Sequence, residues 1–226
     1  MSSHAPSLGL VTIGQAPRPD LMTDIRAMIG DGPIVFEAGA LDAVGAAELP
    51  GLAAVPGEVS LISRLRNGST VEISRERAIP LLQDALTRVA DAGARIFAIL
   101  CTSEFPTFQA PGPILLPNIL LANAIHDIGG VRRVGLMPPL ESQVTEVAAR
   151  WRKLGYEPTV EAATPYGPDA AILGAAERLR RHQVDVVIPD CQGYRSHHLT
   201  ILRSVLDCQI LLPNTVVGER LREYFA

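Results

Sequence analysis

The sequence contains one short pattern twice, and this repetition constrains the fold more than any other feature. The pentapeptide Ile-Leu-Leu-Pro-Asn occurs at residues 114–118 and again at residues 210–214. Each copy lies downstream of an apolar run that ends at a cysteine, Cys101 in the first half and Cys191 in the second. Self-similarity of this kind indicates a duplicated unit, so we expect two similar lobes rather than one continuous domain.

Short apolar runs alternate with amphipathic segments in both halves. The runs are continuous in hydrophobicity, as is typical of parallel strands that helices cover on both faces. Strands are predicted at residues 8–13, 96–100, 134–137, 184–188 and 209–212. Helices are predicted after Asp20 and at residues 79–89, 140–154, 169–182 and 215–225, and a hairpin turn is predicted at Asn67-Gly68. This alternation predicts the α/β class.

The predicted fold is α/β with two pseudo-symmetric lobes, each a mostly parallel sheet flanked by helices. The first lobe is expected at residues 1–117 together with 214–226, and the second at residues 118–213. In open α/β sheets, ligands bind beyond the carboxyl ends of the strands, and both Cys101 and Cys191 lie at such ends. We therefore expect the active site in the cleft between the lobes.

Composition excludes several classes of protein. The 226 residues include 24 acidic and 20 basic side chains, so no nucleic-acid partner is expected. No apolar run approaches the ~20 residues that cross a bilayer, and residues 1–9 lack the features of a secretory signal. We therefore expect no membrane association and a cytoplasmic location. A homodimer is a reasonable prior for a soluble enzyme of this size.

The side-chain chemistry narrows the function further. Lys153 is the only lysine, which argues against a pyridoxal-phosphate enzyme, a phosphate-binding loop and an iminium-forming aldolase. The three cysteines fit neither a disulfide framework nor a zinc knuckle, so they are expected to be thiols. The histidines match no metal-binding motif. We therefore expect an enzyme with no cofactor and no metal.

Cys101 and Cys191 are the predicted catalytic residues. A thiol beside backbone N–H groups or at a helix N-terminus is stabilised as the thiolate and can act as a base or nucleophile. Two thiols that face one substrate from opposite lobes could remove a proton from its alpha carbon and return one to the other face. The same N–H groups can hold the carboxylate of the substrate.

Ten further residues are predicted to bind the substrate. They end the first strand or follow the two cysteines, and they are Thr12, Gly14, Gln15, Arg18, Thr102, Ser103, Gln192, Gly193, Tyr194 and His198. Arg18 could hold a carboxylate through its fork, and His198 could tune the Cys191 thiol or relay protons. For three of these residues a structural role is the alternative to substrate binding. Gly14 could shape a turn, and Arg18 and His198 could lie on the surface.

Four other residues are expected to be structural. Cys208 lies in an apolar strand and has no counterpart in the repeat, so it is expected in the core. Asp190 is expected to hydrogen-bond its loop rather than act on the neighbouring thiol. Asn118 and Asn214 are expected to cap the helices that follow them.

The cysteine-tipped strands resemble the aspartate/glutamate racemase superfamily, and within it the chain is more similar to the AroM family. The closer resemblance is carried by Leu10-Val11-Thr12-Ile13-Gly14 with Pro17, by Pro189-Asp190-Cys191-Gln192-Gly193-Tyr194 with His198, and by Leu211-Leu212-Pro213-Asn214. It covers nearly all of the chain. The resemblance implies two pseudo-symmetric α/β lobes, paired catalytic cysteines and PLP-independent chemistry.

Departures from the superfamily pattern keep the reaction open. Its racemases typically carry Cys-Asn-Thr at the first site and Gly-Cys-Thr-His at the second, where this chain has Cys101-Thr102-Ser103 and Asp190-Cys191-Gln192-Gly193. The resemblance implies a racemase or epimerase, an isomerase that acts on a small carboxylic acid. The alternatives are a decarboxylase or isomerase that depends on Cys191 alone, and a carboxylate-binding protein without turnover.

Overall fold

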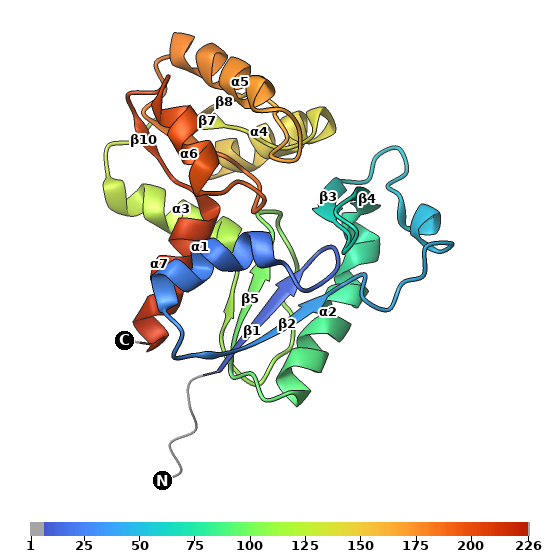
Figure 1. Cartoon of the computed structure of the whole chain (residues 1–226). Helices are drawn as coiled ribbons and strands as arrows, with labels where there is room; N and C mark the ends of the chain where they lie inside the picture. Colours follow the sequence, from blue (N-terminus) through green and yellow to red (C-terminus); the bar gives the residue numbers. More distant parts are fainter. Residues whose placement is uncertain (1–6, 226) are drawn as a thin grey trace. The chain divides into compact units, whose positions relative to one another are not determined.

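A computed structural model of the protein describes residues 7–225. The chain divides into two compact units, of which the first extends to Asn118 and resumes at Val217, and the second comprises Ile119–Val216. The chain leaves the first unit near the start of helix α3 (Pro117–Ile128) and returns to it within helix α7 (Pro213–Phe225). The first unit is therefore built from both ends of the sequence (Figure 1).

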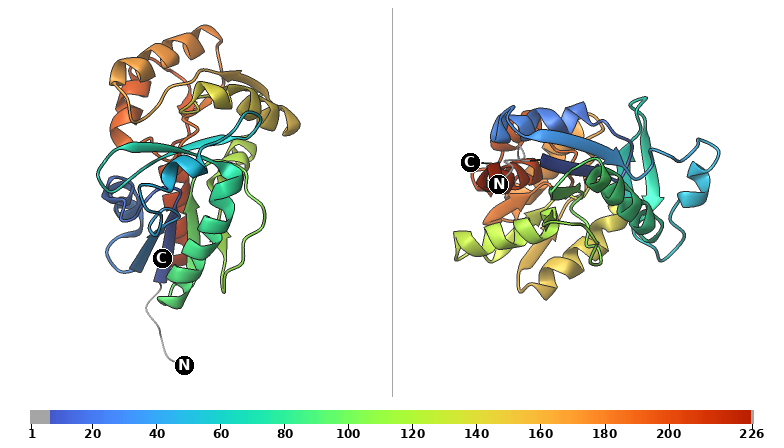
Figure 2. Two further views of the ribbon diagram at one scale, coloured as in Figure 1. Left: turned by 90° about the vertical axis from the view of Figure 1, so that its right-hand side faces the viewer. Right: turned by 90° about the horizontal axis from the view of Figure 1, so that it is seen from below.

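The first unit contains a parallel sheet in the order β2-β1-β5-β6. Helix α2 lies along one face of this sheet, and α1 and α7 lie on the other side (Figure 1, Figure 2). An antiparallel hairpin, β3–β4, precedes α2. The elements are β1 (Ser7–Thr12), α1 (Pro19–Ile29), β2 (Ile34–Gly39), a 3-10 helix (Leu49–Leu52), β3 (Ser60–Arg64), β4 (Thr70–Ser74), α2 (Arg75–Asp91), β5 (Ile96–Leu100) and β6 (Ile114–Leu115).

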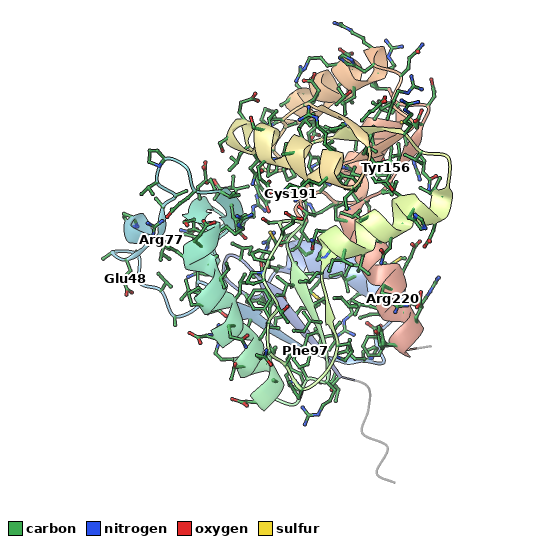
Figure 3. The ribbon with its side chains drawn as sticks, turned by 180° about the vertical axis from the view of Figure 1, so that it is seen from behind. Glu48, Arg77, Phe97, Tyr156, Cys191 and Arg220 are labelled. Carbon is green, nitrogen blue, oxygen red and sulfur yellow. The ribbon has the colours of Figure 1, made fainter. Side chains whose placement is uncertain are left out.

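Alternate residues of the central strands form the core beneath α2. Val11 of β1 and Phe97 and Ile99 of β5 belong to one buried cluster with Leu82 and Leu86 of the helix, and Figure 3 labels Phe97 within it. Each such side chain contributes about 1.5 to 3 kcal/mol when it leaves water. This burial fixes the helix on the sheet and holds the carboxyl ends of β1 and β5 side by side.

The second unit contains another parallel sheet, in the order β10-β9-β7-β8. One core cluster joins this sheet to α5 and α6, and a second joins it to α3 and α4. The remaining elements are β7 (Arg133–Leu136), a 3-10 helix (Glu141–Gln143), α4 (Val144–Lys153), β8 (Glu157–Val160), α5 (Asp169–Arg181), β9 (Val186–Ile188), α6 (Ser196–Arg203) and β10 (Gln209–Ile210).

The two sheets are equivalent strand by strand. Gly9 of β1 pairs with Phe97, and Gly135 of β7 pairs with Val187. Both glycines allow close packing, because a Cβ atom at Gly9 would lie 2.7 Å from Cγ2 of Val89, and one at Gly135 would lie 3.0 Å from Cγ2 of Val187. Gly9 and Gly135 thus hold matching positions, each where the chain packs too closely for a side chain.

The predicted α/β class with two parallel sheets flanked by helices is confirmed. The sequence patterns missed the strands β2, β6 and β8. Glu37 in β2 and Pro158 in β8 interrupt the hydrophobicity, which only edge strands tolerate. The single helix predicted at residues 140–154 is a 3-10 turn followed by α4. Within residues 7–225, no helix combines the length and hydrophobicity needed to cross a membrane.

Asp185 is expected to stabilise the second unit in a pH-dependent way. Its carboxylate accepts the backbone N–H groups of Arg132 and Arg133 and pairs with the Arg133 guanidinium at 2.8 Å. The Arg133 side chain first, and then these N–H groups, lower the pKa of Asp185 from 3.8 to about 2. Because the folded pKa lies below the unfolded one, this stabilisation is complete above pH ~4 and is lost as the pH falls toward 2.

The variant Asp185→Asn should therefore have a lower urea midpoint than the wild type at pH 7. The difference between the two midpoints should shrink as the pH approaches 2, because protonation then removes the same charge from the wild type. Equal midpoints at pH 7 would contradict this role of Asp185.

Candidate active site

Cys101 and Cys191 occupy equivalent positions in the two units. Phe97 pairs with Ile114, the first residue of the first pentapeptide, and Cys101 lies four residues after Phe97. In the same way, Val187 pairs with the first residue of the second pentapeptide, and Cys191 lies four residues after Val187. Each thiol follows the carboxyl end of a central parallel strand, which is where α/β sheets bind ligands.

The Cys191 thiol lies in a tight loop between β9 and α6. Cys191 is buried, with 8% of its surface exposed, and is labelled in Figure 3. The backbone N–H of Gly193 donates to its Sγ across 3.4 Å. The N–H of Tyr194 donates to the Cys191 carbonyl at 3.2 Å and closes the turn. An N–H group directed at the sulfur stabilises the thiolate relative to the thiol.

Asn214 holds this loop from the first turn of α7. Its Nδ2 donates to the Tyr194 carbonyl at 3.0 Å, and its Oδ1 accepts from Gln192 Nε2 at 2.5 Å. The expectation that Asn118 and Asn214 cap their helices is wrong, because α3 and α7 begin at the preceding prolines. Proline suits the first helical position, where its missing N–H costs no hydrogen bond. Asn214 instead fixes the backbone after Cys191.

Tyr194 is a fully buried part of the same loop. Its hydroxyl donates to the Ala163 carbonyl at 2.6 Å. Burial raises the pKa of the phenol well above its ordinary value of 10.0, and the charges of Cys191 and Asp190 raise it further. The hydroxyl therefore keeps its proton and donates a hydrogen bond to the Ala163 carbonyl, so Tyr194 holds the loop through both its side chain and its backbone.

Asp190 forms a buried ion pair with Arg150 of α4. The exposed fractions of the two side chains are 6% for Arg150 and 2% for Asp190. The guanidinium compensates the carboxylate beside Cys191, so the thiol does not face an unbalanced negative charge. The sequence prediction missed this partner because Arg150 lies in a segment rich in charges, although its spacing from Val147 and Trp151 puts all three on the buried face of α4.

His198 lies in the first turn of α6 and is 1% exposed, so its expected alternative as a surface residue is wrong. Its Nδ1 accepts the backbone N–H of Arg195 at 3.0 Å, and its ring meets the Tyr194 ring edge-on at 5.4 Å. Since Nδ1 accepts, the hydrogen of the neutral ring is on Nε2. His198 thus fixes the end of the Cys191 loop where α6 begins.

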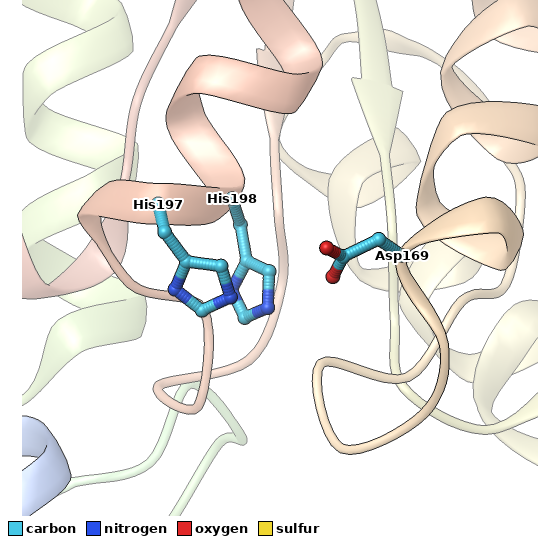
Figure 4. Close-up of side chains that lie close together, drawn as sticks. All are labelled: Asp169, His197 and His198. Carbon is cyan, nitrogen blue, oxygen red and sulfur yellow. The ribbon is translucent and has the colours of Figure 1, made fainter.

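His198 also belongs to a group of three side chains of the metal-binding type. Asp169, His197 and His198 each offer a ligand atom within 4.8 Å of the others (Figure 4). No sequence motif indicates this group, because Asp169 is distant from the two histidines along the chain. With Nδ1 bonded to Arg195 and Nε2 protonated, the neutral His198 ring has no lone pair for a metal. The three residues therefore do not fit a metal centre.

The first unit presents a different set of groups after its cysteine. Cys101 is half-buried, and Thr102 and Ser103 are buried with 5% and 7% exposed. By their distance from the cysteines, they occupy the positions of Gln192 and Gly193 in the second unit. The two residues after Cys101 therefore carry hydroxyl groups, whereas Cys191 is followed by the amide of Gln192 and by a glycine.

Arg18 lies beyond the carboxyl end of β1 and is 4% exposed, so the surface alternative is wrong for this residue too. Its fork donates two hydrogen bonds of 2.8 Å to Asp20. Its Nη1 lies 3.3 Å from Thr12 Oγ1 and 3.4 Å from Ser63 Oγ. Burial opposes the charge of Asp20, but Arg18 and Arg64 lower its pKa below 3.8. Arg18 is thus held by Asp20 on one side of its guanidinium and by the Thr12 and Ser63 hydroxyls on the other.

Gly14 and Gln15 connect β1 to the hairpin β3–β4. The backbone N–H of Gln15 donates to the Arg64 carbonyl, and Gln15 Oε1 accepts the N–H of Arg66, both at 3.0 Å. A Cβ atom on Gly14 would lie 2.0 Å from the Arg64 carbonyl oxygen, so only glycine fits there. The hairpin thereby brings Ser63 next to Arg18, a contact that its sequence does not reveal.

Cys208, expected in the core, lies immediately before β10 and is half-buried against the core of the second unit. Burial raises the pKa of its thiol. A protonated thiol without a counterpart in the first unit fits a packing role.

The profile of a protein family described as AroM protein matches residues 8–225. No curated protein matches the sequence.

Several solved structures share the fold at low sequence identity. A liganded mutant of arylmalonate decarboxylase has a TM-score of 0.67 and 15% identity, over 96% of this chain and 92% of that chain. Allantoin racemase from Pseudomonas fluorescens has a TM-score of 0.65 and 12% identity, over 96% and 89%. Maleate isomerase from Pseudomonas putida has a TM-score of 0.63 and 12% identity, over 96% and 91%. At these identities the similarity concerns the fold.

Proposed function

Because the chain belongs to the AroM family, we propose that it is a cofactor-independent racemase or epimerase of a small carboxylic acid. Similar folds occur in racemases, isomerases and a decarboxylase, which supports an enzyme of isomerase type. The observation that carries the proposal is the equivalence of Cys101 and Cys191, each at the same register position beyond the carboxyl end of a central strand.

In the proposed reaction, one cysteine is a thiolate and the other a thiol. The thiolate takes the proton from the alpha carbon, and the electron pair left on that carbon is delocalised into the carboxylate of the substrate. The other thiol then gives its proton to the opposite face of the carbon, so one thiol and one thiolate are present before and after. The configuration at the alpha carbon is thereby inverted without any other reactant.

The electrostatic surroundings of Cys191 support this role. The N–H of Gly193 favours the thiolate, and Arg150 compensates the charge of Asp190, which would otherwise oppose it. We propose that backbone N–H groups of the cysteine loops, together with the Thr12 hydroxyl, receive the carboxylate. These donors would stabilise the developing anion.

The proposal predicts that the protein exchanges the alpha hydrogen of its substrate with solvent. The protein is incubated with amino acids and hydroxy acids in deuterated water, and NMR measures deuterium at the alpha carbon. Deuterium should appear at the alpha carbon of the substrate, because the thiol that returns the hydrogen exchanges with water. The double variant Cys101→Ser/Cys191→Ser is the control and should show no exchange. Absence of exchange with every ligand that binds the wild type would contradict racemisation.

A second candidate is a decarboxylase or isomerase in which Cys191 alone acts. It is favoured by one observation, the burial of Cys191 with the N–H of Gly193 on its Sγ, because Cys101 is only half-buried. In this case Cys191→Ser should remove most of the activity, and Cys101→Ser should lower it only slightly. A racemase should lose inversion with either substitution.

A further inference from the structure

The loop between β8 and α5, residues 161–168, packs on the Cys191 loop within the second unit. One hydrogen bond joins the two loops, because the Ala163 carbonyl accepts the Tyr194 hydroxyl at 2.6 Å. Three residues further along the chain, the side chain of Tyr166 also contacts the Cys191 loop. The β8–α5 loop is thus bonded to the Cys191 loop at one point and packed against it at another.

The contact between Tyr166 and Gly193 leaves no room for a side chain on the glycine. A Cβ atom at Gly193 would lie 2.5 Å from the hydroxyl oxygen of Tyr166, 2.6 Å from its Cζ and 2.9 Å from Cγ of Pro165. The φ angle of Gly193 lies outside the left-handed region that favours glycine. Packing against Tyr166 and Pro165, rather than the backbone conformation, therefore requires a glycine at this position.

Gly193 supplies the N–H that faces the sulfur of Cys191 at 3.4 Å. Glycine has more backbone freedom than any other residue, so Gly193 does not by itself fix the direction of this N–H. Hydrogen bonds with Asn214 hold the residues on either side of it. The phenol of Tyr166 restrains Gly193 itself, because a change in its backbone torsions would move its atoms against the ring.

Tyr166 is itself held in a turn. Its backbone N–H donates to Oγ1 of Thr164 at 3.3 Å, and the N–H of Gly167 donates to the Thr164 carbonyl at 3.4 Å. Pro165, whose ring fixes φ, lies between them. The half-buried side chain of Tyr166 is therefore fixed at its backbone as well as packed at its hydroxyl end.

We propose that Tyr166 is a positioning residue for Cys191. Its phenol holds Gly193 in the conformation that directs the N–H at the sulfur, and this N–H favours the thiolate. Without the ring, the loop keeps its hydrogen bonds with Asn214, but the N–H of Gly193 can turn away from the sulfur. The role concerns the ionisation of Cys191 and applies to a racemase and a decarboxylase alike, while its effect on turnover rests on the proposed function.

The first test measures the pKa of the Cys191 thiol. In the background Cys101→Ser/Cys208→Ser, Cys191 is the remaining cysteine of the chain. The pH midpoint of its labelling by iodoacetamide gives the pKa, and the ultraviolet absorbance of the thiolate gives the same value where labelling is slow. Tyr166→Ala should raise this midpoint by about one unit, because the thiolate loses a hydrogen bond.

The conservative variant separates the ring from its hydroxyl group. Tyr166→Phe keeps Cζ against Gly193, so it should keep the midpoint of the parent. A midpoint in Tyr166→Ala that is unchanged or lower overturns the proposal. An equal rise in Tyr166→Phe overturns it too, because the effect would then belong to the hydroxyl group rather than to packing.

Tyr156→Ala, in the same background, is the control for the loss of a packed phenol ring elsewhere in the second unit. Tyr156 packs against Trp151, with ring centroids 5.6 Å apart. It immediately precedes β8 and so lies at the amino end of the sheet, whereas Cys191 follows the carboxyl end of β9. Tyr156→Ala should lower the melting temperature and leave the Cys191 midpoint unchanged. An equal rise of the midpoint in this variant would indicate general loosening of the unit and would overturn the proposal.

The second test uses the close contact between Tyr166 and Gly193. Gly193→Ala would place a Cβ 2.5 Å from the phenol oxygen, so the loop must shift and the Cys191 midpoint should rise. Tyr166→Ala removes the cause of this clash, so the rise in the double variant should lie below the sum of the two single rises. Additive rises would mean that the two residues act separately and would overturn the proposal.

The role of Tyr166 and the proposed function fail in different ways. If the midpoint rises in Tyr166→Ala but the wild type incorporates no deuterium, the function is wrong and the role of Tyr166 stands. If the wild type incorporates deuterium but the midpoint in Tyr166→Ala does not change, the function stands and the role of Tyr166 is wrong.

Discussion

Replacing Cys191 by serine should lower kcat/KM about 100- to 10,000-fold, because a positioned acid/base group contributes about 10² to 10⁴ in rate and a serine hydroxyl does not ionise near neutral pH. The structure gives the reason for this severity. The N–H of Gly193 donates to the sulfur of Cys191 at 3.4 Å, and Asn214 bonds the Gln192 side chain on one side of that N–H and the Tyr194 carbonyl on the other. A serine oxygen in the same loop would occupy the position of the sulfur but would not ionise to act as an acid or base.

Two matched substitutions make this result specific. Cys208→Ser changes a half-buried thiol outside the site, so it should leave kcat/KM within about twofold of the wild type. Cys101→Ser should match the loss of Cys191→Ser if two thiols act. The measurement is inversion of the acid identified by deuterium exchange, followed by circular dichroism. Retention of a tenth of the wild-type rate by Cys191→Ser would exclude it as an essential acid or base.

Removing the partner of Asp190 should strongly destabilise the second unit. Arg150→Met leaves a carboxylate buried without its cation, which costs about 3 to 5 kcal/mol. Trp151 is the only tryptophan and is buried beside Arg150, so its fluorescence during urea unfolding reports on this unit. The unfolding midpoint of the variant should fall accordingly.

Charge rather than volume should explain this loss. The double variant Arg150→Met/Asp190→Leu removes both charges and should recover most of the stability of the single variant. Arg178→Met, which breaks the exposed pair with Glu161, should cost less than about 1 kcal/mol. The single variant should also raise the pKa of the Cys191 thiol, measured as the pH dependence of iodoacetamide labelling. Failure of the double variant to recover would instead point to lost packing of the Arg150 stem.

The fold followed from the sequence wherever hydrophobicity was continuous. The central strands β1, β5, β7 and β9 are apolar throughout and pack between helices, so their pattern is unambiguous. The edge strands β2 and β8 were missed because one side of each makes no ladder, which lets Glu37 and Pro158 occur in them. The turn between β3 and β4 was predicted from Asn67-Gly68, a pair that favours tight hairpins.

The candidate site was only partly foreseen. The repeat pointed to Cys101 and Cys191 because each copy of the pentapeptide lies downstream of an apolar run that ends at a cysteine. The side chains that contact Asp190 and Arg18 come from elements that are distant in the sequence, and no local sequence pattern predicts these contacts. Arg150 reaches Asp190 from α4, and Ser63 reaches Arg18 from the hairpin. Such contacts depend on tertiary packing, which spacing along the chain does not encode.

The path of the chain through the two units has a consequence for synthesis on the ribosome. The sheet of the first unit is complete by β6, yet the helix that packs on α1 is drawn from the C-terminal residues, where Gly218 lies against Met28. All of the second unit emerges in between. The unit whose sheet is translated first is therefore completed only after the second unit, and its α1 face stays uncovered until residues 217–225 have been synthesised.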